Sequence, residues 1–285
     1  MVVWYILGMS KLYIPVKILN KKYADKLVKG EVFMRSLYEF GLLSNTDEDK
    51  SEELKNNYRG DPYECASRIY ARPEDNPMFA TDPNFCKYAK GVYEIDDGDP
   101  QYFKIFSMYC LEFDTVTRRF IVPDKRILEF GDTAVIFADF KTFMFKIDMA
   151  MFKEYNMHCF LIDRIKYYSP NETAYLNPIF QKRDSYAWQK ELRIAVCPLD
   201  VNRPTSENKF KLIEDKKPIL LNVGTNENLV YAISTKDLLN HKFPHGMTIQ
   251  FPMEENNSIF NMMQNNTLET MKSYLTRSSQ LIFHM

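Results

Sequence analysis

The charged residues of segment 180–197 are the side chains whose types and spacing could do chemistry. Glu191 and Arg193 stand two residues apart at the start of an apolar, β-prone run, so on a strand both point to one face. A carboxylate beside a guanidinium can stabilise developing positive charge, while the guanidinium binds an anionic group. We therefore predict a strand with one buried face and one chemically equipped face, with Glu191 as the candidate catalytic acid.

The residues just before this strand add donors and rings. Lys182 and Gln189 supply nearby donors, and Tyr186 and Trp188 could stack on a base or a nicotinamide ring. The alternative is a solvated strand face that carries an exposed Glu–Arg pair, worth about 0–1 kcal/mol. The two alternatives differ in whether these side chains face a pocket or bulk water.

A second candidate site is the loop around Arg59, Gly60 and Asp61. Gly60 allows a positive φ and the close approach of a ligand, and Arg59 could hold a phosphate bidentately. The alternative is a surface turn in which the arginine and the aspartate satisfy each other.

A third candidate is Asp132, which with Asp139, Asp163 and Glu191 could form an acidic cluster for Mg²⁺. The alternative is an Asp-capped turn before a buried strand. The four histidines are scattered along the chain, so we expect no histidine metal site.

The composition narrows the class of protein. The formal net charge is −1, from 37 basic and 38 acidic residues, which gives no strong sign of a nucleic-acid binder, although a local groove could still be basic. Only 9 glycines occur, and no phosphate-binding glycine motif is present. The 5 cysteines are odd in number and include no CxxC pair, which argues against a disulfide scaffold or a structural zinc site.

The hydrophobic runs predict a soluble, cytoplasmic protein without a membrane span. Residues 1–7 (MVVWYIL) are apolar but far shorter than the roughly 20 residues that a spanning helix needs. They form either a first strand or an extended start, in which case Met9 is the true initiator.

The order of elements predicts an α+β fold with a mixed, largely antiparallel sheet and flanking helices. We expect a main domain over residues 1–199 and a strand and helix extension over 200–285 that packs on it. Residues 140–151 are predicted as strand followed by helix, and 256–276 as a C-terminal helix. The other predicted elements are strands at 13–18, 31–36, 102–113, 133–137, 159–168, 218–223 and 229–234, and helices at 21–29, 124–129 and 235–239.

The order of motifs over residues 20–196 resembles a group of uncharacterised bacterial and phage-encoded proteins. The motifs are GEVFMRS at 30–36, RGDPYE at 59–64, IFSMYC at 105–110, and the late segment from Lys182 through Trp188 to Glu191 and Arg193. The chain departs from the group at Gln189, where an acid is common.

More remotely, the layout is similar to ADP-ribosyltransferases, which bind NAD in a split mixed sheet and place a glutamate on a late strand. The resemblance implies that Glu191 is that acid and that Tyr186 or Trp188 lies against the nicotinamide. It also implies that Arg35 or Arg59 contacts a phosphate, and that NAD is the cofactor.

Three functions therefore stay open. The first is an NAD-binding, ADP-ribosyltransferase-like protein in phage–host conflict. The second is a non-catalytic module that engages a host or phage protein through Tyr, Phe and Arg side chains, the types that binding hot spots favour. The third is a Mg²⁺-dependent nuclease that uses Asp132, Asp163 and Glu191. The oligomeric state is open as well.

Overall fold

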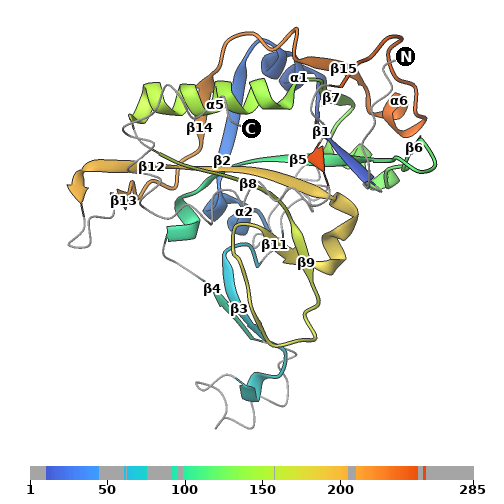
Figure 1. Ribbon diagram of the computed structural model, residues 1–285. Coiled ribbons are helices and arrows are strands. Elements are labelled where there is room, and N and C mark those ends of the chain that lie inside the picture. The colour runs from blue at the N-terminus through green and yellow to red at the C-terminus, as the bar shows by residue number, and fades with distance from the viewer. Residues whose placement is uncertain are drawn as a thin grey trace.

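The protein folds around one large antiparallel sheet, which confirms the predicted α+β class (Figure 1). The computed structural model describes residues 11–44, 61, 63–75, 92–95, 99–156, 158–204, 210–249 and 253–254. Within them the large sheet has eleven strands, and all of its strand pairs are antiparallel.

Six strands form the main path of this sheet, and five pair beside it. In sheet order the path is β13 (Phe210–Leu212), β12 (Glu191–Pro204), β5 (Lys104–Asp114), β1 (Lys11–Leu19), β7 (Thr133–Phe137) and β15 (Val230–Ser234). The others are β2 (Glu31–Ser36), β6 (Arg119–Phe120), β8 (His158–Arg164), β14 (Ile219–Asn222) and β16 (Met253–Glu254). Strands from beyond residue 200 are part of this sheet, because β14 pairs with β2 and β15 with β7.

Two small sheets lie beside the large one. Strands β3 (Ala66–Tyr70), β4 (Val92–Ile95) and β10 (Ala174–Tyr175) form the first, which projects downward in Figure 1. Strands β9 (Lys166–Tyr168) and β11 (Gln181–Arg183) form the second, the single parallel pair among the described strands. The predicted strand at 159–168 is therefore two strands, β8 and β9, which pair with different partners.

The helices are short apart from α5. The described α-helices are α1 (Lys21–Val28), α2 (Leu37–Ser44), α5 (Phe140–Tyr155) and α6 (Thr235–Leu239), and the 3₁₀ helices are η1 (Pro73–Asp75), η2 (Asp99–Tyr102), η3 (Lys125–Phe130) and η4 (Asp184–Gln189). None of the helices in these described ranges is long and apolar enough to cross a membrane. The predicted helix at 256–276 lies outside the described residues.

The prediction of strand then helix for residues 140–151 is wrong, because α5 is helical from its first residue. The Asp139 carboxylate accepts a hydrogen bond from the Thr142 amide at 3.0 Å and so caps the helix. The buried residues then recur at helical spacing, at Phe140, Phe143, Ile147 and Met151. The aromatic residues are typical of a strand, but the helical spacing of the buried residues and the Asp139 cap favour a helix.

Both faces of the large sheet are covered. On one face, α5 and α1 pack over Val32, Phe106, Phe137 and Ile194. On the other face, η3 and α6 cover the β1–β7 end, and α2 with segment 177–180 covers the β12 end. The predicted alternation in β12 is confirmed, since residues 192, 194 and 196 join the core under α5 while Ala195 and Cys197 join the opposite one.

Gly131 fixes the sharp entry into β7. Its φ is +152°, and a Cβ added there would lie 2.1 Å from the carbonyl carbon of Leu19. Gly224 also has a positive φ, of +73°, but a Cβ added at this position would meet no heavy atom within 4 Å. A side chain added at Gly224 would therefore cause backbone strain alone, whereas one added at Gly131 would cause backbone strain and a steric clash.

We predict that Gly131→Ala lowers the free energy of unfolding by at least about 2 kcal/mol, because it adds a backbone clash to the strained φ. The matched change Gly224→Ala should cost about 1 kcal/mol, since only the conformational penalty applies. Urea unfolding of both variants measures the difference. Equal losses would contradict the packing of Gly131 against Leu19.

Candidate functional site

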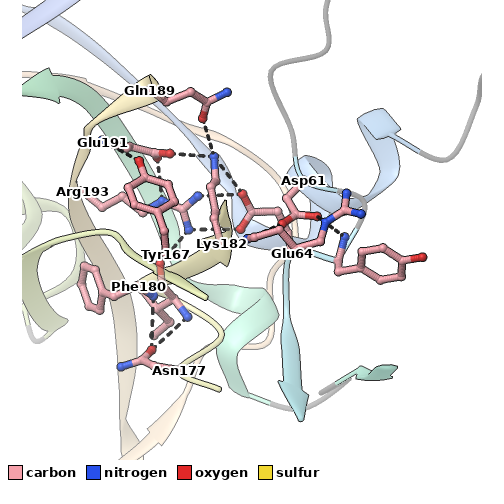
Figure 2. Close-up of polar contacts among 12 residues, drawn as sticks. Asp61, Glu64, Tyr167, Asn177, Phe180, Lys182, Gln189, Glu191 and Arg193 are labelled. Atoms are coloured by element: carbon pink, nitrogen blue, oxygen red, sulfur yellow. Dashed lines mark hydrogen bonds and ion pairs between the residues drawn. The ribbon is translucent and has the colours of Figure 1, made fainter. Parts of the chain in front are cut away.

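The start of β12 carries a buried ion network of four charged side chains (Figure 2). We call it the buried ion network, and its members are Glu64, Lys182, Glu191 and Arg193. The exposed fractions of these side chains are 0%, 3%, 6% and 0%. The alternative of a solvated, exposed Glu–Arg pair is therefore excluded, because the loop before β3 and strand β11 cover this face of β12.

Arg193 is bound on three sides. Its guanidinium holds both oxygens of Glu64, with Nη2 to Oε1 at 2.7 Å and Nη1 to Oε2 at 3.1 Å. Its Nε donates to Glu191 Oε1 at 2.7 Å, and Nη1 also donates to the Ile179 carbonyl at 2.6 Å. This forked geometry suits an arginine and leaves little of the guanidinium for a further anion.

Lys182 closes the network from β11. Its ammonium lies 2.6 Å from Glu191 Oε2 and 3.2 Å from Glu64 Oε1, and it donates to Gln189 Oε1 at 3.1 Å. An ammonium has three protons, so these contacts use its donors fully. Two cations and two carboxylates balance, which is what burial of four charges requires.

Burial and the neighbouring opposite charges together set the pKa values of Glu191 and Arg193. Burial raises the pKa of Glu191, but the charges of Arg193 and Lys182 and the hydrogen bonds from both outweigh it, so the net shift is downward. Burial lowers the pKa of Arg193, and Glu191 and Glu64 more than reverse that effect. Both groups stay charged at neutral pH, so Glu191 is not poised to exchange a proton.

A second ion pair ties the same loop to β11. The Asp61 carboxylate accepts from the Arg183 amide at 3.0 Å and from Arg183 Nε at 2.9 Å. The Arg183 guanidinium also lies over the rings of Tyr63 and Tyr186, at 4.5 and 5.5 Å from their centroids. The loop that carries Glu64 is thus bound by two ion pairs, Glu64 with Arg193 and Asp61 with Arg183.

Left-handed backbone flanks both carboxylates of the network. Cys65, directly after Glu64, has φ +70°, and Lys190, directly before Glu191, has φ +41°. Non-glycine residues adopt this region at a cost and only where the surroundings impose it. The turn at Lys190 ends η4 and aims Glu191 toward Lys182.

The structure brings together only some of the predicted site residues. Lys182, Gln189, Glu191 and Arg193 meet in the network, and Tyr186 lies beside it, with Lys182 Nζ 5.9 Å from its ring centroid. The others lie elsewhere or are not described. Trp188 stacks on Phe130 at 5.4 Å under Arg126, Arg35 is exposed on β2 beside Phe33, and Arg59 and Gly60 lie outside the described residues.

The acidic residues considered for Mg²⁺ take structural roles. Asp132 accepts from the Lys21 amide at 2.8 Å, and Asp139 caps α5. Asp163 accepts from the Arg164 amide at 2.7 Å. Among the described residues, no group of three or more His, Cys, Asp or Glu side chains could hold a metal ion.

The sequence places Asp61 in the second candidate loop and Glu64 in the motif at 59–64, but it links neither of them to the late strand, and it does not select Tyr167. Glu64 lies 129 positions from Arg193 in the chain, so no spacing rule links them. The Tyr167 hydroxyl accepts from the Glu191 amide at 3.0 Å, and burial raises the pKa of that hydroxyl. The one available signal is the dense acidic and aromatic content of residues 61–64, which is equally typical of a surface turn.

We predict that Glu191→Gln destabilises the protein by about 3–5 kcal/mol, because it leaves one buried positive charge without a partner. The double variant Lys182→Met/Glu191→Gln removes one charge of each sign and should be more stable than the single variant by about 1 kcal/mol or more. Chemical denaturation of the two single variants and the double variant measures the coupling. Additive losses would contradict a shared network.

The pH dependence of stability should carry the signature of Glu191. Its pKa is lowered in the folded protein, so its contribution is present above the unfolded-state value of about 4.3 and is lost as pH falls below it. We predict that wild type loses stability between about pH 6 and pH 3 more steeply than Lys182→Met/Glu191→Gln. Asp124→Asn is the control, because that carboxyl, whose pKa the Arg126 hydrogen bond lowers to about 2, is partly exposed and screened. Equal slopes in wild type and the double variant would contradict the assignment.

No protein-family model matches the chain, and neither a curated protein nor a solved structure matches it. Its function is therefore inferred from the geometry above.

Proposed function

We propose that this chain is a non-catalytic module that binds another protein through the outer face of α5. One observation carries the proposal. Phe145, Met149 and Phe152 are 39%, 47% and 51% exposed, and their spacing places them on one face of the helix. Large apolar side chains in one exposed row are a typical feature of interaction surfaces.

The charges beside this row define the partner. Lys153 is exposed next to Phe152 and forms no ion pair with a described residue, whereas Asp148 on the other side of the row is paired with His158 at 2.8 Å. A bacterial or phage protein with an apolar surface edged by a carboxylate would complement this face. Burial of the three apolar side chains would supply the affinity, and the carboxylate would fix the orientation.

The state of Glu191 supports a role without chemistry at the buried ion network. Each of its carboxylate oxygens is bound by a buried cation, and its side chain is 6% exposed. A substrate could reach it only if Lys182 or Arg193 first left, which would strand a buried charge. The network is then a structural element that fixes the small sheets against β12.

The protein-binding proposal is tested by affinity capture with purified wild type, followed by reconstitution of the captured protein at known concentration. Phe152→Glu should weaken the reconstituted complex by about thirtyfold or more, because the most exposed apolar side chain of the row is replaced by a charge. Phe33→Glu is the matched control, since Phe33 is equally exposed but lies on β2 and outside the row. Equal affinity of both variants would contradict the role of α5.

One observation favours a second candidate, an ADP-ribosyltransferase-like reaction with NAD at Glu191. Motif residues from the loop at 61–64 and from the late strand meet in the network, and strained residues flank both carboxylates. Such strain gathers at functional sites.

Thermal unfolding with millimolar NAD separates the two candidates. A ligand at 100 times its Kd adds about 2.7 kcal/mol of stability. The binding-module proposal predicts no shift that depends on the network. A rise in melting temperature with NAD that occurs in wild type and disappears in Lys182→Met/Glu191→Gln would favour NAD chemistry at Glu191 over the binding module.

A further inference from the structure

A second part of the molecule combines rings and positive charge in a way that the proposed function does not use. A depression of about 500 Å³ lies between the β5–β6 hairpin and the segment that follows α6, at the end of the sheet where Figure 1 shows β6 and α6. Its lining consists of Phe113, Arg118, Arg119, Phe120, Val122, His241 and Phe243. It shares no residue with the buried ion network or with the exposed row of α5.

Four rings form a connected wall along this depression. Phe113 and Phe120 pack edge to face across the hairpin with their centroids 5.1 Å apart, and the Phe120 centroid lies 4.4 Å from that of Phe243. The His241 ring is nearly parallel to that of Phe243, at 17° and 6.3 Å. Phe120 and Phe243 are only partly buried, so part of this wall faces the depression.

His241 is held in an unusual position. Its φ is +54°, in the left-handed region, and its amide donates to the Leu238 carbonyl at 3.2 Å at the end of α6. Its Nε2 is shielded from solvent and has no hydrogen-bond partner among the described residues.

The charge of the depression is positive. Arg118 and Arg119 are exposed at its rim and form no ion pair with any described residue. Asp114, the cross-strand partner of Arg119, accepts hydrogen bonds from the amides of Val116 and Thr117 at 2.9 and 2.7 Å. No acidic side chain lines the depression among the described residues, so an anion would meet no repulsion from the lining.

We propose that this depression binds a nucleotide. The base stacks on the wall of Phe120 and Phe243, and the phosphate is held by Arg118 and Arg119. A flat ring matches the aromatic wall, and a phosphate matches two forked guanidinium groups. An uncharged aromatic compound would leave the arginines unused, and inorganic phosphate would leave the rings unused.

The same chemistry is present in a free nucleotide and in a nucleotide of single-stranded nucleic acid. Calorimetric titration of the purified protein with AMP, adenosine, inorganic phosphate and a single-stranded oligoadenylate distinguishes these sources. We expect saturable binding of AMP, with adenosine and phosphate each at least about tenfold weaker. If the oligonucleotide binds more tightly than AMP and with strong salt dependence, the physiological source is a nucleic acid strand.

Two variants test the proposed roles of the arginines and of the aromatic wall. Arg118→Gln/Arg119→Gln should remove the preference for AMP over adenosine, and Phe243→Leu should weaken both ligands by about tenfold. Arg72→Gln is the control for loss of a surface arginine, because Arg72 lies by η1 and pairs with Asp75. The same titration with NAD separates the sites, since NAD binding lost in Phe243→Leu belongs here and NAD binding lost in Lys182→Met/Glu191→Gln belongs to the network.

Absence of saturable binding for both AMP and oligoadenylate would overturn the proposal. So would AMP binding that is unchanged in Phe243→Leu and in the double arginine variant. Circular dichroism and the melting temperature of each variant show that a loss of binding does not come from unfolding.

Discussion

The mutual neutralisation of Glu64, Lys182, Glu191 and Arg193 is the interaction on which the β12 end of the molecule depends. Four charges leave water together, and each is compensated only while the other three are in place. Such a network adds little stability compared with an apolar core of the same shape, but it allows one arrangement of its parts. The loop before β3, strand β11 and the start of β12 must therefore take fixed relative positions.

The surrounding fold prepares that arrangement. Strand β12 pairs with β5 on one side and β8 on the other, so Arg193 projects from a position that backbone pairing fixes twice. The Tyr167 hydroxyl and the Asp61–Arg183 pair then hold β9, β11 and the Glu64 loop around it. The apolar face of the same strand packs under α5. The network and the exposed row of α5 thus lie on opposite faces of one sheet, which allows a structural role on one face and a binding role on the other.

Local patterns in the sequence predict much of this fold and only half of the site. Alternation in residues 191–197 predicts which side chains share a face, and the sequence predicts the helix at 235–239 that Ser234 caps, but it does not predict the helix start that Asp139 caps. Alternation does not predict whether the second face of the strand is covered. The sequence therefore allows an exposed Glu–Arg pair at the place where the structure has a buried network. Glu64 could not be placed, because its contact with Arg193 closes across 129 positions and depends on the positive φ of Cys65.

Native-state hydrogen exchange at the amides around the buried ion network tests most directly whether it is a closed structural element. The relevant amides are those of Ile165, Lys166 and Arg183, which bond to the Glu191 carbonyl, the Phe180 carbonyl and the Asp61 carboxylate. We predict that they exchange only through global unfolding, with the same free energy and denaturant dependence as the core strands β5 and β7. Exchange through a low-energy local opening, while β5 and β7 stay protected, would show that the network opens in the native state and would contradict its role as a closed element.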